Sequence, residues 1–247
     1  MSIEPDRAAS PLVVRFDAEK LRAAFAVAVF ASTDGTLPSL AHIRFTVDEA
    51  GRTWTQATDR YIAAVHRHHA PAPMQTVDVL VPRDAALKLT KALRTARGEV
   101  AFDVHPHGGP AWLITWQDRK GARQIADVSW LPVDGALTWP KMLTLVTEEL
   151  PAHSGVVVDP ARLVAVAEWQ KLAGGPYAPP NGITLVPRGN GRHARRIQAV
   201  ITSLHDGGEG LAALLCGVNL AKYSQDDQDV ADVVAEVTAA LTDGAPR

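Results

Sequence analysis

The stretch LPSLAHIRFTVDEAGRTWTQATDRYIAAV, residues 37–65, carries the clearest structural pattern in the chain. Apolar residues alternate with polar ones over residues 40–47, as in a strand with one buried face. The polar run 48–52 contains Asp, Glu and Gly, which is the composition of a tight turn. Residues 54–65 then return as two extended pieces that bend at Thr58 and Asp59. The pattern predicts a three-stranded antiparallel meander.

Length, charge and cysteine content narrow the class of protein. The chain has 247 residues, 47% of them hydrophobic, so it can bury a core in one long or two ordinary domains. Its net charge of −2 means that any contact with nucleic acid needs a local concentration of Lys and Arg. The single cysteine, Cys216, excludes an intramolecular disulfide, and a buried thiol fits a reducing, cytoplasmic setting. We find no signal peptide and no run of about 20 apolar residues, so no membrane partner is expected.

A strand-helix-meander pattern repeats along the chain. The first unit combines a strand at 12–16 with a helix at 17–31, for which Asp17 is the N-cap, and the meander that ends near residue 69. The second unit has a strand at 76–82, a helix at 83–97 that Gly98 ends, and strands at 100–104, 111–116 and 123–130. Both units therefore read as βαβββ.

A third unit follows a linker. Its predicted elements are a strand at 154–158, a helix that starts at Pro160 and ends before Gly174 and Gly175, and strands at 182–187, 195–204 and 210–218. The interval between helices then predicts a fourth, acidic helix over 224–241, with apolar residues at helical spacing. We therefore expect an α+β protein with a complete domain at 12–133, a linker at 134–151 and a partial domain at 152–242.

The motif LxxIRFxxDxxxRTWTxATDRYIAA resembles the signature hairpin of the bacterial DNA polymerase III β sliding clamps, and the resemblance extends over about residues 12–220. In that family, βαβββ units form a ring with sheets outside and helices inside. The resemblance implies loose contact between the helices and duplex DNA. The helix at 83–97 carries cations at successive steps of three residues, which suit a phosphate backbone or, equally, a solvated surface. The candidate DNA-facing residues are Lys20, Lys88, Lys91, Arg94, Arg97 and Lys171.

The resemblance also implies a pocket beside the Ala-Thr-Asp turn for short apolar peptides of polymerases and other replication proteins. Carried over by position, its residues are Leu40, Thr58, Arg60, Tyr61, Ile62, Ala63, Val146 and Thr147. Two positions depart from the family pattern, because Arg60 stands where a Gly is usual and Ile62 where an Arg is usual. The groove is therefore expected to differ in shape and charge, and hairpin core is the alternative interpretation of Leu40, Tyr61 and Ile62.

The resemblance predicts a non-catalytic, sliding-clamp-like replication factor that needs no cofactor. Because a ring in this family contains six domains, a chain with two domains closes a ring only as a trimer. The alternative is an open adaptor or regulator that binds a protein partner without encircling DNA.

Two other chemistries are weaker interpretations. The histidines at 66, 68, 69, 105 and 107 lack accompanying cysteines or carboxylates, so we expect solvated strand ends rather than a metal-dependent enzyme. The run Gly189-x-Gly191-x-x-Ala194 imitates a dinucleotide fingerprint, but the residues after it alternate like a strand and Asn190-Gly191 is a hairpin turn.

Overall fold

The structure, a computed structural model, describes most of the three predicted units. The described residues are 13–37, 40–59, 61–70, 76–103, 111–133, 148–149, 160–175, 184–189, 198–205 and 209–216. The predicted strand at 154–158 and the predicted helix at 224–241 lie outside them. None of the described helices is long and apolar enough to span a membrane.

The elements follow the predicted order. The first unit consists of β1 (Val13–Asp17), α1 (Ala18–Ala26), the 3₁₀ turn η1 (Val27–Phe30), β2 (His42–Val47), β3 (Arg52–Thr58) and β4 (Ile62–His69). The second consists of β5 (Val77–Pro82), α2 (Arg83–Ala92), η2 (Leu93–Thr95), β6 (Ala96–Asp103), β7 (Ala111–Asp118), β8 (Arg123–Ser129) and the short β9 (Leu131–Pro132). The third has β10 (Glu148–Glu149), α4 (Pro160–Ala173), β11 (Thr184–Gly189), β12 (Gln198–His205) and β13 (Glu209–Cys216).

The first two units interlock by exchanging their first strands. One sheet has the order β1-β6-β7-β8, so the first strand of unit one completes the meander of unit two. The other has the order β10-β11-β12-β13-β4-β3-β2-β5-β9, so β5 completes the meander of unit one. The same nine-stranded sheet continues into the third unit, because β13 pairs antiparallel with β4 from Leu215 opposite Ile62 to Gly210 opposite Arg67. Neither βαβββ unit forms its sheet alone.

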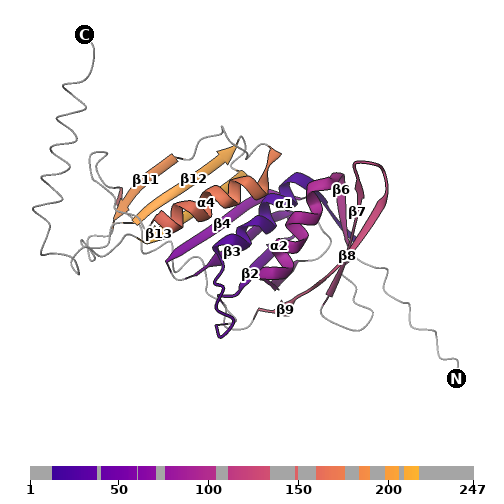
Figure 1. The fold of residues 1–247 in the computed structure, drawn as a ribbon, viewed down its shortest axis with the longest axis horizontal. Helices are drawn as coiled ribbons and strands as arrows, with labels where there is room; N and C mark the ends of the chain where they lie inside the picture. The colour runs from indigo at the N-terminus through magenta and orange to yellow at the C-terminus, as the bar shows by residue number, and fades with distance from the viewer. Residues whose placement is uncertain are drawn as a thin grey trace, which may run out of the picture.

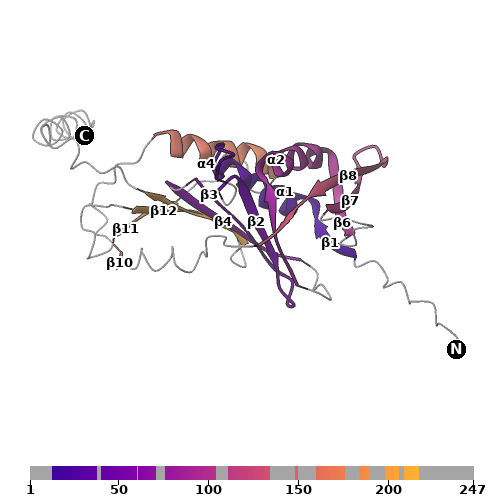
Figure 2. The same ribbon diagram turned by 90° about the horizontal axis from the view of Figure 1, so that it is seen from below.

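The helices share one side of the molecule (Figures 1 and 2). Figure 2 shows α4 and α2 along the upper side, with strands β12, β4 and β2 beneath them. Between helices and sheets lies an aromatic core, in which the rings of Phe16 and Phe102 are 5.0 Å apart and those of Phe45 and Trp112 are 5.7 Å apart. The α+β fold with helices on one face, predicted from the sequence, is confirmed.

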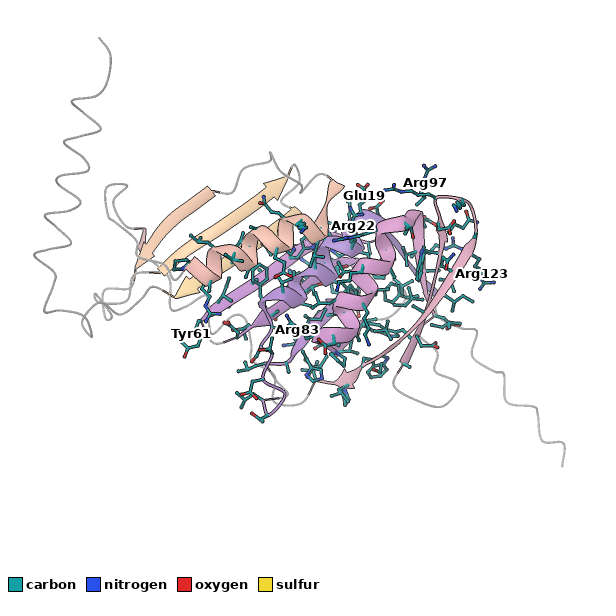
Figure 3. All side chains as sticks on the ribbon, in the orientation of Figure 1. Glu19, Arg22, Tyr61, Arg83, Arg97 and Arg123 are labelled. Carbon is teal, nitrogen blue, oxygen red and sulfur yellow. The ribbon has the colours of Figure 1, made fainter. Side chains whose placement is uncertain are left out.

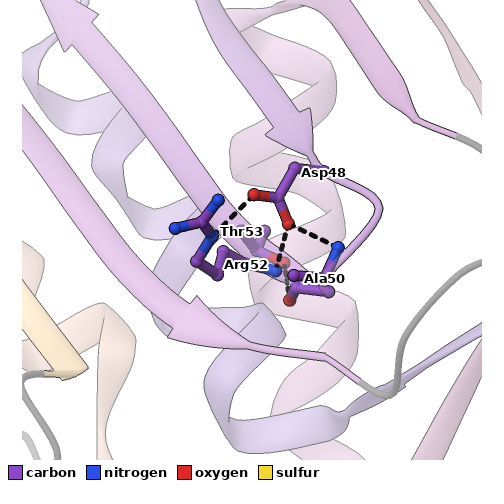
Figure 4. A network of polar contacts seen from close by, with 5 residues as sticks. Asp48, Ala50, Arg52 and Thr53 are labelled. Atoms are coloured by element: carbon purple, nitrogen blue, oxygen red, sulfur yellow. Dashed lines mark hydrogen bonds and ion pairs between the residues drawn. The ribbon is translucent and has the colours of Figure 1, made fainter.

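The turn between β2 and β3 is fixed by one carboxylate (Figure 4). Asp48 accepts hydrogen bonds from the backbone N–H groups of Ala50 at 3.0 Å and Arg52 at 2.9 Å, and it pairs with the Arg52 guanidinium at 2.6 Å. Gly51 follows with φ of 76°, a backbone conformation that favours glycine. Burial acts to raise the pKa of the Asp48 carboxyl, but the bonds from Arg52 and Ala50 outweigh it and hold that pKa below 3.8.

Helix boundaries differ from the prediction in the second unit. The helix predicted over 83–97 ends at Ala92, η2 follows, and Arg97 belongs to strand β6. Gly98 does not end the helix; its φ of 65° lies where the register of β6 against β7 shifts between Arg97 and Val100. A bulge requires an unusual backbone angle just as a helix end does, so the glycine alone did not distinguish them. In the first unit the N-cap is confirmed, because Asp17 accepts from Glu19 N at 2.9 Å and Lys20 N at 3.0 Å.

Candidate functional site

Helix α4 is held against α1 by a buried hydrogen bond. The Trp169 side chain is fully buried, and its indole N–H donates to the carbonyl oxygen of Ala23 at 3.0 Å. Ala23, Ala24 and Ala26 of α1 are also fully buried, because their small side chains allow helices to approach closely. The helix of the third unit is therefore part of the same layer as the helices of the first two.

A second contact joins α1 to the C-terminal end of α4. The Nε of Arg22 donates to the Ala173 carbonyl at 2.6 Å, where helix carbonyls lack partners within the helix. Gly174 and Gly175 follow with φ of 57° and 55°. A Cβ at Gly174 would lie 2.9 Å from Arg22 Nη2, and one at Gly175 would lie 2.9 Å from Glu19 Oε2. The two glycines thus provide the positive φ and the space that the Arg22 contact needs.

Three of the predicted DNA-facing cations lie together on the outer side of the second helix. Ala86, Leu89 and Thr90 of α2 are buried, whereas Lys88, Lys91 and Arg94 are exposed. Because the buried positions face the sheets, these cations face solvent from the helix layer. This matches the arrangement predicted for this helix, except that Arg94 lies in the 3₁₀ turn η2.

The remaining predicted cations are dispersed. Lys171 is exposed in the last turn of α4, whose exposed surface is otherwise largely apolar, with Leu163 at 42% and Val164 at 65% exposure. Lys20 is half-buried in the first turn of α1. Arg97 lies apart from the helical stripe, in a groove of about 510 Å³ that also includes Arg15 of β1 and Arg123 of β8. Assigning Arg97 to the helix was therefore wrong.

Arg119, which the sequence analysis missed, extends the basic end of α2. It lies in the turn between β7 and β8 and its guanidinium donates to the Arg94 carbonyl at 3.5 Å. The pKa of Arg22 is lowered, first by burial and then by the nearby charges of Arg94 and Arg119, while Glu19 acts in the opposite direction. These three arginines form a basic cluster, whose positive charge the Glu19 carboxylate partly offsets. The signal in the sequence is the basic tip Asp118-Arg119-Lys120-Gly121 between two strands.

The Ala-Thr-Asp turn is anchored to the N-terminal end of α4, away from Ala173. Figure 3 labels Tyr61 beside this turn. The Asp59 carboxylate accepts from the backbone N–H groups of Tyr61 and Ile62, each at 2.9 Å, and forms an ion pair with Arg162. The Arg162 guanidinium lies over the Tyr61 ring at 4.9 Å from its centroid. We call Asp59, Tyr61 and Arg162 the hairpin corner. Arg162 of α4 is thus engaged with Asp59.

The described residues of the predicted peptide pocket divide into one exposed and four buried side chains. Tyr61 is 59% exposed, whereas Leu40, Thr58, Ile62 and Ala63 are buried at 8% exposure or less. Arg60, Val146 and Thr147 lie outside the described residues. Tyr61 therefore offers the accessible surface at this corner, and Ile62 belongs to the main hydrophobic core.

Two of the histidines are buried, contrary to the prediction of solvated strand ends. His66 is fully buried and His68 is 1% exposed, with ring centroids 5.4 Å apart, and His66 lies 6.1 Å from the Trp169 ring. They are buried because aromatic side chains cover this face of β4: Trp169 of α4 lies against His66, and the Phe16 ring lies 6.1 Å from that of His68. Within the described part of the chain, no group of His, Cys, Asp and Glu could hold a metal ion, and His105 and His107 lie outside it.

Neither a protein-family model nor a curated protein matches this sequence. Solved structures do match. The DNA polymerase III subunit beta from Borrelia burgdorferi, in complex with a natural product, has a TM-score of 0.56 and 9% identity, over 88% of this chain and 67% of that chain. The Helicobacter pylori beta clamp, in complex with 3,4-difluorobenzamide, has a TM-score of 0.56 and 12% identity, over 87% of this chain and 68% of that chain.

A third similar structure is the DNA polymerase III subunit beta from Pseudomonas aeruginosa, with a TM-score of 0.50 and 16% identity, over 88% of this chain and 69% of that chain. At such identities a structural match reports on the arrangement of the backbone. The exchanged first strands, the sheet that continues between units and the helices on one side agree with this likeness. This chain has the fold of the bacterial DNA polymerase III β sliding clamps.

Proposed function

We propose that this chain is a non-catalytic, sliding-clamp-like replication factor whose helix layer contacts the backbone of duplex DNA. The observation that carries the proposal is the exposed row of Lys88, Lys91 and Arg94 on the outer side of α2, next to the basic cluster. Lysine and arginine side chains bind phosphates without reading bases, as a protein that moves along DNA requires. The fold it shares with DNA polymerase III β subunits supports the same role.

The test is the salt dependence of duplex binding, measured by fluorescence anisotropy with a labelled duplex. The combined Lys88→Ala, Lys91→Ala and Arg94→Ala variant is expected to bind more weakly. Its slope of log affinity against log salt should fall by about 2 to 3 units, because each phosphate contact contributes about 0.9. The control is Arg15→Ala, an exposed residue on the sheet between Val14 and Phe16, which are buried. Equal slopes for the triple variant and the unchanged protein would refute the proposal.

We further propose that the hairpin corner docks a short apolar segment of a polymerase or another replication protein. The exposed Tyr61 ring, held between its own turn and Arg162, offers a flat, partly apolar surface of fixed orientation. Tyr61→Ala should weaken binding of a short peptide that carries leucine and phenylalanine, measured by calorimetry. Leu113→Ala, at a partly exposed position on β7, is the control. Unchanged affinity in Tyr61→Ala would exclude this corner.

The second candidate function is an open adaptor that binds a protein partner and no DNA. The observation in its favour is the exposed surface of α4, where Leu163 and Val164 stand in the helix layer in place of cations. Peptide binding at Tyr61 together with no salt-dependent duplex binding would favour this alternative.

A further inference from the structure

The four-stranded sheet β1-β6-β7-β8 carries polar residues on the face that points away from the helices. In β1 the exposed Arg15 alternates with buried residues on both sides, so its side chain points out of the core. Ala101 of β6 lies opposite Arg15, and Thr115 of β7 lies opposite Ala101. Residues opposite each other in neighbouring strands share a face of the sheet, so these three form one row across the outer face.

A second row on this face places two cations beside one amide. Gln117, two residues beyond Thr115 on β7, lies directly opposite Arg97 of β6 on one side and Arg123 of β8 on the other. Neighbouring strands are about 4.8 Å apart, so the backbones of these two arginines are only about 10 Å apart. Figure 3 labels both at the end of the molecule formed by β6, β7 and β8. Arginines of three strands therefore border one surface.

Between the two rows the surface is hollow, because the residues there are small. Ala101 and Thr115 line a groove of about 510 Å³ that Arg15, Arg97 and Arg123 border. We call it the arginine groove. Its volume lies within the range of roughly 300–1,000 Å³ that is usual for small-molecule sites. A ligand in the groove therefore meets three guanidinium groups from three different strands.

One carboxylate partly offsets the positive charge among the described residues that line the groove. Glu99 accepts a hydrogen bond from Arg15 at 3.1 Å, and the two side chains are 60% and 62% exposed. An ion pair so exposed contributes little to stability, so Arg15 can exchange Glu99 for a stronger anion at small cost. Three guanidinium groups against one carboxylate leave a net charge of +2 on the groove.

We propose that the arginine groove binds the polyphosphate chain of a nucleoside triphosphate or of inorganic triphosphate. A guanidinium group bonds two phosphate oxygens at once, and a chain of phosphates offers acceptors to several such groups that arrive from different strands. A single carboxylate, with two oxygens, satisfies one. The Thr115 hydroxyl and the Gln117 amide add uncharged donors. The groove lies on the face of the sheet opposite the helix layer, so the proposal goes beyond the proposed function and does not rest on it.

Calorimetric titration of the full chain with ATP, sodium triphosphate and adenosine, without divalent cations, tests the proposal. ATP and triphosphate should bind, whereas adenosine should give no heat. Equal affinities support recognition of the phosphate chain alone, and tighter binding of ATP supports a nucleotide as the ligand. Arg15→Ala and Arg97→Ala should each weaken triphosphate binding at least about tenfold, because each removes a charge-assisted contact.

The matched control is Lys91→Ala, which removes an exposed cation from α2 on the other side of the sheet. It should leave triphosphate binding unchanged. Absence of triphosphate binding to the unchanged chain, or an equal loss in Lys91→Ala and Arg97→Ala, would overturn the proposal. Tighter binding of a glutamate-rich peptide than of triphosphate would also overturn it, since the groove would then take an acidic segment of a protein.

Two further variants separate a shaped site from general attraction between charges. Ala101→Leu keeps every charge but fills the groove between the two rows, so it should weaken triphosphate binding at least about tenfold. Glu99→Gln removes the opposing carboxylate and should tighten binding several-fold. Circular dichroism checks that both variants fold. If Ala101→Leu binds triphosphate as tightly as the unchanged chain, the groove is not the site and the proposal is wrong.

Discussion

Strands β4 and β8 occupy the same place in successive βαβββ units, yet one is internal and the other is an edge. β4 pairs with β3 and β13, and its residues Ile62, Ala63 and Ala64 are all buried. β8 pairs with β7 in the described chain and alternates exposed Arg123, Ile125 and Asp127 with more buried residues. The difference is that β4 is buried on both faces over residues 62–64, whereas one face of β8 is exposed and carries charged residues.

The largest effect is expected where the third unit covers β4. Trp169→Ala removes a fully buried indole that contacts α1 and lies 6.1 Å from His66 of β4. It also leaves the Ala23 carbonyl without its bond, so we expect a loss of about 3–5 kcal/mol in the free energy of unfolding. Urea denaturation measures it. The matched change on the open strand, Ile125→Ala, should cost less than about 0.5 kcal/mol, because that side chain is 57% exposed.

A larger side chain should also destabilise the protein more at the covered edge of β4 than at β8. Ala213 of β13 is fully buried opposite Ala64 of β4, so Ala213→Leu should lower the free energy of unfolding by about 1–3 kcal/mol. Ala126→Leu, at a half-buried position on β8, should cost clearly less. Thermal and urea unfolding of both variants would check the difference. Equal losses would mean that β4 and β13 do not pack as tightly as their burial indicates.

A smaller effect is expected at the end of α4. Gly174→Ala places a Cβ at positive φ, which costs roughly 1–2 kcal/mol, and brings it to 2.9 Å from Arg22 Nη2. The control, Gly121→Ala in the turn before β8, has a φ of 81° but open space around it. Gly121→Ala therefore measures only the free-energy cost of placing an alanine at positive φ. The extra loss in Gly174→Ala then measures the displacement of Arg22 from Ala173, and no extra loss would show that Arg22 moves aside freely.

The smallest effect is a pH dependence at the turn before β8. The N–H of Ala122 lowers the pKa of Asp118 below 3.8 against the effect of burial, with help from Lys120 N–H and the Gln124 side chain. Because the folded pKa lies below the unfolded one, the stabilisation is present above pH 3.8 and is lost as pH falls through the folded pKa. Asp118→Asn should therefore differ most from the unchanged chain at neutral pH and least in acid. Asp48→Asn, in the turn before β3, should show the same pH dependence. Urea unfolding at several pH values measures it: the free energies of unfolding of each variant and of the unchanged chain should become equal in acid, and a difference that persists there would contradict the prediction.

Much of the fold could be predicted because each element carries its own signal. The alternation over 40–47 and the Pro160 start of α4 are local patterns, and both are confirmed. Which edge pairs with which is set by distant parts of the chain, so the contact between β13 and β4 and the burial of His66 and His68 were not predictable from period alone.

The candidate site was predictable to the same extent. Helical spacing identified Lys88 and Lys91 correctly as exposed, since period reports the faces of a helix. It placed Arg97 on that helix wrongly, because a helix end and a bulge share the same glycine signal. Arg119 escaped notice since it reaches Arg94 from a turn far along the chain.

Site-specific photo-cross-linking to duplex DNA tests most directly whether the helix layer faces DNA. A benzophenone amino acid is placed at Lys91 on α2 in one variant and at Arg15 on β1 in another, both exposed positions. Cross-linking from position 91 and little or none from position 15 is the expected result. Cross-linking from position 15 with none from position 91 would contradict it.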